Sequence, residues 1–119
     1  MLTFSELSSD EFATFAKTLP MNNFLQSAEM FSRYRAIGKE AYLVGLRSGL
    51  EVKLAALLVC IYKGKGQKIF SAPGGPLLDY FSPDTQSLLA TFVAKARPFL
   101  KQESASILQI SPNIFMTTR

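Results

Sequence analysis

Hydrophobic positions in the first forty residues recur every three or four residues, the spacing of helices that bury one face. A short strand over residues 2–4 precedes the first helix, which is capped by Ser8 and ends at Pro20. Glu11 completes a capping box with Ser8. The second helix is capped by Ser27 and ends at Gly38. The predicted buried stripes are Phe12, Phe15, Ala16 and Leu19 in the first helix, and Met30, Phe31, Tyr34 and Ile37 in the second.

The pattern then changes to three consecutive strands, over residues 41–46, 52–62 and 68–72. Ser48-Gly49 supplies a hairpin turn between the first two. The unbroken apolar centre of the middle strand indicates that both of its faces are covered. A buried helix is the rival interpretation. The hairpin before the run and the Lys-Gly-Lys-Gly sequence after it, at 63–66, favour a strand.

A Pro-Gly-Gly-Pro turn at residues 73–76 separates these strands from a long helix. Ser82 is the expected cap, and Pro83 occupies the first helical position, where proline is favoured. Pro98 is expected to kink or stop the helix. A last strand covers residues 105–110 and ends at Ser111-Pro112-Asn113. The predicted buried side of the helix consists of Leu88, Leu89, Phe92, Val93, Ala96 and Leu100.

The resulting order is strand, two helices, three strands, helix and strand. It predicts an α/β (α+β) fold, in which a mixed sheet carries two helices on one face and the long helix on the other. This order matches the acetyltransferase-like (GNAT) fold. With 119 residues, of which 48% are apolar, residues 1–119 are expected to form one globular domain.

The amino-acid composition excludes several kinds of catalytic and metal site. The chain has no histidine, which excludes a Ser-His-Asp triad, a Cys-His pair and a His-ligated metal, and no metal site is expected. Its one cysteine, Cys60, lies in an apolar run and is expected to be a buried thiol. The longest apolar run, 54–62, is shorter than the roughly 20 residues that span a bilayer, and no signal peptide is evident. We therefore expect a cytoplasmic protein, with surface contact to a membrane left open.

Charge is mildly basic, because thirteen Lys and Arg outnumber nine Asp and Glu. A net charge of +4 is compatible with RNA, nucleotide phosphates or anionic lipid. Two small clusters could contact phosphates or simply form solvated surface. They consist of Lys63, Lys65 and Lys68 at a turn, and of Arg33, Arg35 and Lys39 near the end of the second helix.

The Gly-rich turn occupies the place where acetyltransferases of this fold hold the pyrophosphate of coenzyme A with backbone N–H groups. Here Pro73 and Pro76 remove donors and Asp79 adds a repelling charge. Coenzyme A binding is therefore not expected, and no cofactor is expected. Asp79 is interpreted either as a residue that orients a substrate amine or as one that caps the loop backbone.

Four segments in order resemble the Fem family of aminoacyltransferases: residues 24–27 (Phe-Leu-Gln-Ser), 38–45, 75–80 (Gly-Pro-Leu-Leu-Asp-Tyr) and 110–112. The resemblance implies transfer of an amino acid from aminoacyl-tRNA to an amine of the peptidoglycan stem peptide, which builds the interpeptide bridge. It implies a lipid-linked or UDP-linked precursor as acceptor, and location at the inner face of the membrane. Members carry two acetyltransferase-like domains. This chain is expected to be the N-terminal one and to be inactive alone, with the catalytic residues outside it.

The resemblance also implies which residues bind the precursor. Relatives usually have Arg-Gly-Pro at the Gly-Gly-Pro of this turn, Asp-Pro at Ser111-Pro112, and several have a precursor-binding lysine at Tyr34. The mechanism implied is aminolysis of an activated ester, without an enzyme-bound intermediate. Two alternatives remain: a small CoA-dependent N-acetyltransferase, and a non-catalytic precursor-binding module. The candidate substrate-binding residues are Arg33, Tyr34, Gly74, Gly75, Pro76, Asp79 and Tyr80.

Overall fold

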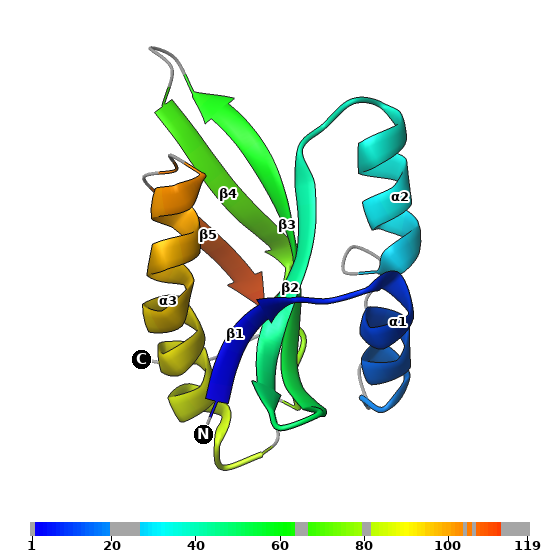
Figure 1. Cartoon of the computed structure of the whole chain (residues 1–119), viewed down its shortest axis with the longest axis vertical. Helices are drawn as coiled ribbons and strands as arrows, with labels where there is room; N and C mark the ends of the chain where they lie inside the picture. Colours follow the sequence, from blue (N-terminus) through cyan, green and yellow to red (C-terminus); the bar gives the residue numbers. More distant parts are fainter. Residues whose placement is uncertain are drawn as a thin grey trace.

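The fold is a five-stranded sheet covered by helices on both faces, seen in a computed structural model that describes residues 2–19, 27–63, 67–79, 82–103, 105 and 107–112 (Figure 1). The strand order is β1-β2-β3-β4-β5. Neighbours are antiparallel except for β4 and β5, which are parallel. The elements are β1 (Leu2–Glu6), α1 (Ser9–Lys17), α2 (Ala28–Ala36), β2 (Ala41–Ser48), β3 (Glu51–Lys63), β4 (Gln67–Gly74), α3 (Thr85–Gln102) and β5 (Ile107–Pro112).

The central strand β3 is buried on both faces, as its apolar run predicts. Successive strand residues point to opposite faces, so one strand serves two cores. One core, between the sheet and α3, takes Leu54, Ala56, Leu58 and Cys60 of β3. The other, between the sheet and the pair α1 and α2, takes Ala55, Leu57 and Val59. The predicted arrangement of two helices on one face and the long helix on the other is confirmed, and the Cys60 thiol is buried.

Both predicted helix caps in the first half of the chain are confirmed. The Glu11 N–H donates to Ser8 Oγ at 3.1 Å, and the Ser8 N–H donates to Glu11 Oε1 at 2.8 Å. The Met30 N–H donates to Ser27 Oγ at 3.1 Å. Gly38 follows α2 with φ of 82°, the left-handed conformation that glycine adopts without strain. Pro20, the predicted end of the first helix, lies outside the described residues, and α1 ends at Lys17.

The prediction for the start of the long helix is wrong. Helix α3 begins at Thr85, and its N-cap is Asp84, whose side chain makes no capping hydrogen bond. Ser82 and Pro83 instead belong to a separate turn that precedes the helix. In that turn Ser82 Oγ accepts from the Asp84 N–H at 3.2 Å. The Thr85 hydroxyl at the first helical position contacts this turn, as described below.

Three further predictions differ from the structure. Ile37 and Val93 were predicted to be buried, but they are 71% and 39% exposed, and Ile37 is the C-cap that follows the last residue of α2. Pro98 does not stop α3, which continues to Gln102. The last strand covers Ile107–Pro112 rather than 105–110. It extends this far because β5 pairs with β4 up to the residue pair Gly74 and Pro112.

Candidate functional site

The Gly-rich turn sits beside a bulge at the end of β4. Val59 of β3 pairs with Ser71 of β4, but Ala55 pairs with Leu77. Four residues along β3 therefore correspond to six along the other side, so two extra residues are accommodated between these pairs. Bulges of this kind bend a strand and re-aim its side chains, and they are common beside functional sites. The bulge therefore directs the chain out of the sheet at the Gly-rich turn, where the sequence predicts substrate-binding residues.

Within the bulge, the turn is closed by its own backbone. The Gly75 N–H donates to the Ala72 carbonyl at 3.0 Å, and the Gly75–Pro76 peptide bond is cis. Pro76 is fully buried. Residues 76–84 separate this turn from the first residue of α3. Because the helix N-terminus does not follow the turn directly, its free N–H groups do not join Gly75 in a single phosphate cradle.

Asp79 lies in the loop that follows, which is anchored through its backbone. The Ser82 N–H donates to the Asp79 carbonyl at 3.0 Å. The buried hydroxyl of Thr85 lies 3.0 Å from the same carbonyl and 2.8 Å from the Ser82 carbonyl. These contacts hold the loop against the start of α3 and leave the Asp79 residue exposed. The Asp79 residue lines a surface hollow, and its two predicted roles, orienting an amine and capping the loop, stay predictions.

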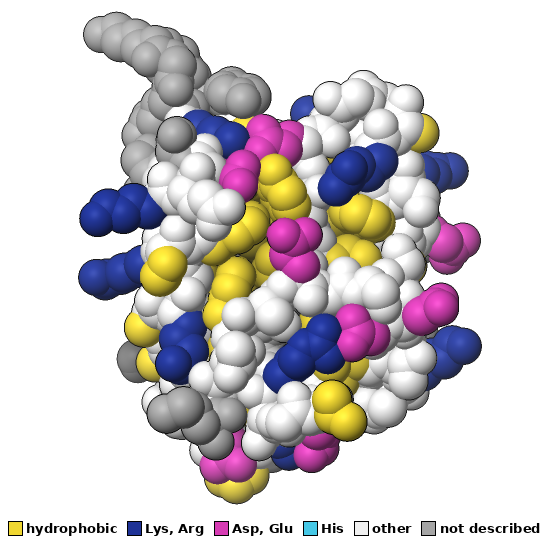
Figure 2. Space-filling model, in the orientation of Figure 1, with side chains coloured by type: hydrophobic (Ala, Val, Ile, Leu, Met, Phe, Trp, Pro, Cys, Tyr) yellow, Lys and Arg dark blue, Asp and Glu magenta, His cyan; other side chains and the backbone are white. Residues whose placement is uncertain are grey.

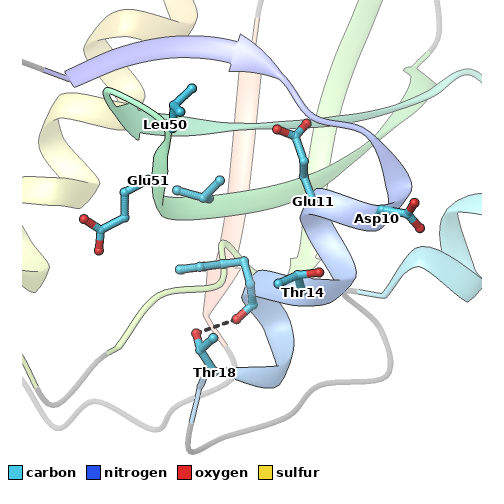
Figure 3. Close-up of a pocket in the computed structure, with 8 residues that line it drawn as sticks. Asp10, Glu11, Thr14, Thr18, Leu50 and Glu51 are labelled. Atoms are coloured by element: carbon cyan, nitrogen blue, oxygen red, sulfur yellow. Dashed lines mark hydrogen bonds between the residues drawn. The ribbon is translucent and has the colours of Figure 1, made fainter.

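Two adjoining hollows run along α1, and together we call them the α1 groove. The first, about 530 Å³, lies between α1 and the β2–β3 turn (Figure 3). The second, about 330 Å³, continues toward the loop before α3. Figure 3 shows Leu50 and Glu51 on the turn across the hollow from Thr14 and Thr18 of α1. The residues common to both hollows are Phe15, Thr18, Glu51 and Val52.

The α1 groove is acidic although the protein is basic. Five of the nine acidic residues line it: Asp10, Glu11, Glu51, Asp79 and Asp84. Among the described lining residues, Lys53 is the one base, and its Nζ lies 3.1 Å from Glu51 Oε2. Excess negative charge in a concave site attracts cations and favours an ammonium over a phosphate.

One of these carboxylates has a structural role. The Arg47 guanidinium donates to both oxygens of Glu11, with Nη1 2.5 Å from Oε2 and Nη2 2.9 Å from Oε1, while its Nε donates to Ser5 Oγ at 2.9 Å. Hydrogen bonds from Arg47 and from the Ser8 N–H lower the pKa of Glu11 from its usual 4.5 to about 2. The pair ties the first turn of α1 to β2, and Glu11 is the member of the pair that lines the groove.

The predicted site residues come together only in part. Tyr34 packs in the same apolar cluster as Leu77, so α2 and the segment after the Gly-Pro turn share one face of the sheet. Arg33 is exposed on α2, whereas Asp79 lines the α1 groove. Gly74 ends β4 opposite Pro112. Tyr80 lies outside the described residues.

Among the described residues of the two small basic clusters, some cations are engaged within the protein and others are exposed. The Lys68 Nζ lies 3.0 Å from Glu40 Oε2, and Arg35 Nε donates to the Ala41 carbonyl at 3.2 Å. Arg33 and Lys39 are exposed. Lys65 lies outside the described residues.

Sequence reasoning missed most of the α1 groove. Thr18, Glu51 and Lys53 come from α1 and the start of β3, and Ser82 and Asp84 from the loop before α3. Each looks like an ordinary surface or capping residue in sequence. The one available signal was Asp79 itself, an acid close to a Gly-rich turn, which indicated a polar site there without naming its partners.

Comparison with solved structures identifies the class of fold. A GNAT family acetyltransferase from Staphylococcus aureus superposes with a TM-score of 0.62, at 8% identity, covering 99% of this chain and 93% of that one. The structure of FemX superposes with a TM-score of 0.76, at 20% identity, covering 93% of this chain and 27% of that one. The protein therefore has the GNAT fold, as its element order predicts.

The sequence gives the family. Residues 7–119 match the FemAB family, and the chain belongs to that family. The chain is 30% identical over 112 residues to the aminoacyltransferase FemA of Staphylococcus aureus, a match that covers 93% of this chain and 26% of that protein. The chain thus spans about a quarter of the length of the curated relatives it matches.

Proposed function

We propose that the protein functions in aminoacyl transfer to a peptidoglycan precursor. It would join an amino acid from aminoacyl-tRNA to an amine of the stem peptide and so build the interpeptide bridge. The family membership and the similarity to an aminoacyltransferase support this proposal. The single structural observation that carries it is the acidic α1 groove, whose lining includes Asp79 of the loop that follows the bulged Gly-Pro turn.

Within this proposal the groove receives the amine acceptor. A primary amine is protonated at neutral pH. Five carboxylates line the groove, and although Arg47 pairs with Glu11 and Lys53 with Glu51, the groove keeps an excess of negative charge. Asp79 stands on a loop anchored at Thr85, which makes it a fixed acceptor for an ammonium hydrogen bond. The precursor would be lipid-linked or UDP-linked, and the Gly75-Pro76 turn would fix the start of the loop that carries Asp79.

The reaction is aminolysis of an ester. The acceptor nitrogen attacks the carbonyl carbon of the aminoacyl ester, an amide bond forms, and the ester bond to the terminal ribose of the tRNA breaks. The bound ammonium must first give up one proton to solvent, which leaves the neutral amine that attacks. The second proton lost by the nitrogen ends on the released ribose hydroxyl. This chain would contribute orientation of the acceptor rather than a covalent intermediate.

The chain is proposed to be the first of two acetyltransferase-like domains, inactive by itself, with its catalytic residues in the remainder of the protein. Its site is proposed to comprise Arg33, Tyr34, Asp79 and Tyr80 together with the turn at 74–76. The protein is proposed to act in the cytoplasm at the inner face of the membrane. No helix among the described residues is long and apolar enough to cross a bilayer.

The test is transfer by the full-length protein, with each charged tRNA and a panel of complete precursors. Asp79→Asn is expected to raise KM for the acceptor several-fold with little change in KM for the charged tRNA. Glu29→Gln, which removes an exposed acid of α2 outside the groove, is the matched control. Absence of transfer with every pair of substrates would refute the proposed function, and equal effects of the two variants would refute the acceptor groove.

Two further measurements separate the alternatives. Gly74→Arg restores the cation that relatives usually carry, and tighter precursor binding is expected. Unchanged affinity would count against precursor contact at this turn. Calorimetric titration with acetyl-CoA is expected to give no heat of binding, because Pro73 and Pro76 remove backbone donors. Measurable binding would favour a CoA-dependent N-acetyltransferase, and precursor binding without turnover would favour a binding module.

A further inference from the structure

An exposed isoleucine stands at the C-terminal end of α2. Ile37, the C-cap, has 71% of its surface exposed, and it lies four residues after Arg33 and two before Lys39. A Cβ added at the neighbouring Gly38 would have no atom within 4 Å, so this end of the molecule opens to the outside. We propose that Arg33, Ile37 and Lys39, here called the α2 tip, contact the surface of an anionic lipid bilayer.

The charge of the α2 tip is uncompensated. Neither Arg33 nor Lys39 forms an ion pair within the described part of the chain. The nearest carboxylate in sequence, Glu40, is already engaged, with Lys68 Nζ at 3.0 Å and the Tyr42 hydroxyl at 2.8 Å. The tip therefore presents cations to the outside, and Figure 2 shows Lys and Arg side chains around the end of the molecule where α2 ends.

A simpler explanation accounts for the cations but not for the isoleucine. Basic residues in the last turn of a helix interact favourably with its dipole, and Arg35 also donates to the Ala41 carbonyl. These effects give no reason for a large apolar side chain beyond the helix, outside either core. An apolar side chain flanked by cations is the arrangement found at bilayer interfaces, where the apolar group enters the acyl boundary and the cations contact headgroups.

The opposite end of the sheet provides a contrast. Leu50, in the turn at the far end of β2, is 96% exposed, but the hollow beside it is lined by Asp10, Glu11 and Glu51 (Figure 1). An anionic surface repels that end and attracts the α2 tip, so the two ends give the protein one preferred orientation. A bilayer suits the tip better than RNA because its exposed apolar group is the aliphatic Ile37, whereas the aromatic residues of α2, Phe31 and Tyr34, pack against the core cluster beneath the helix.

This inference deepens and rests on the proposed function, since it brings the domain to the surface on which a lipid-linked acceptor lies. Its test needs no transfer. The full chain is mixed with vesicles of phosphatidylglycerol and phosphatidylcholine, or of phosphatidylcholine alone, and the bound fraction is measured by flotation. Binding is expected only with phosphatidylglycerol, and it is expected to weaken with added salt.

Two variants probe the tip. Arg33→Gln combined with Lys39→Gln is expected to lower the partition coefficient roughly 25-fold, since each cation near an anionic surface contributes about 1 kcal/mol, or about fivefold. Ile37→Ser is expected to lower it roughly tenfold through lost apolar burial. The matched controls are Lys17→Gln combined with Lys95→Gln, which has the same charge change elsewhere, and Leu50→Ser. Circular dichroism establishes that each variant is folded.

Each outcome of these measurements either supports or overturns the proposed contact between the α2 tip and the bilayer. The proposal stands if the tip variants lose binding and their controls keep it. It falls if the controls lose as much, if phosphatidylcholine alone binds equally, or if no vesicle binds. Stronger competition by inorganic phosphate than by chloride at equal ionic strength would indicate a phosphate-ion site instead, and displacement by uncharged tRNA would indicate a nucleic-acid surface. Vesicle binding without any transfer would refute the proposed function and leave the bilayer contact intact.

Discussion

Ala55 and Leu77 exchange two backbone hydrogen bonds, with the Ala55 N–H 3.0 Å from the Leu77 carbonyl and the Leu77 N–H 2.6 Å from the Ala55 carbonyl. This single bridge returns the chain to the sheet after the bulge at the end of β4. It also buries the Leu77 side chain against the α1 and α2 face. The loop that carries Asp79 therefore starts from a fixed point in the core.

Leu77→Ala tests that anchor. The side chain is 4% exposed, and truncating a buried leucine removes its transfer free energy and leaves a cavity. We expect the free energy of unfolding to fall by about 2–5 kcal/mol in urea titrations. Leu50→Ala, at a side chain that is 96% exposed, is the control and should change stability by less than about 0.5 kcal/mol. Equal small losses would mean that Leu77 does not anchor the loop.

Gly45→Ala tests a close approach between strands. A Cβ at Gly45 would lie 2.4 Å from the Leu54 carbonyl oxygen and 2.9 Å from Leu7 Cδ1, so the backbone must shift. We expect destabilisation of about 3 kcal/mol, measured by thermal and urea unfolding. Gly49→Ala is the comparison. It has open space but a φ of 64°, so about 1–2 kcal/mol is expected there. A Gly45 variant as stable as the parent would contradict the packing.

Glu11 should contribute stability that depends on pH. Its pKa is about 2 in the folded protein and near 4.5 when unfolded, so folding favours the deprotonated carboxylate. The contribution is present above about pH 4.5 and is lost as pH falls toward 2. We expect Glu11→Gln to lower stability at neutral pH and to flatten its decline in that window. Glu29→Gln should keep the parental slope, and a parental slope in the Glu11 variant would argue against the Arg47 pair as the cause.

Tyr42 should contribute stability that is lost in alkali. Burial, followed by hydrogen bonds to Glu40 and Glu103, raises the pKa of its phenol above the usual 10. The protonated form is thus favoured by folding, and its contribution is present below pH 10 and declines above it. We expect Tyr42→Phe to cost about 1 kcal/mol at neutral pH and to weaken the alkaline decline. Tyr34→Phe is the control, and identical alkaline profiles for Tyr42→Phe and the parent would exclude this role.

The five strands and three helices could be predicted from local sequence patterns alone. The apolar run of β3, the stripe of α1 and the caps at Ser8 and Ser27 are properties of neighbouring residues, and they are confirmed. The stripe of α2 is confirmed except at Ile37. The start of α3 was not predicted correctly. Ser82 and Pro83 have the composition of a helix start, yet they form a turn whose Ser82 carbonyl, with that of Asp79, accepts from the Thr85 hydroxyl, and the helix begins at Thr85.

The sequence by itself determined the elements, their order, the fold class and the family resemblance, because periodicity, capping and motif spacing are written in consecutive residues. Only the tertiary structure decided the two-residue bulge before Leu77, the acidic α1 groove and the exposure of Ile37. Each of these depends on which strand and which loop meet in space. Thr18, Lys53 and Asp84 are far apart in sequence, and only strand pairing and helix packing bring them to one surface.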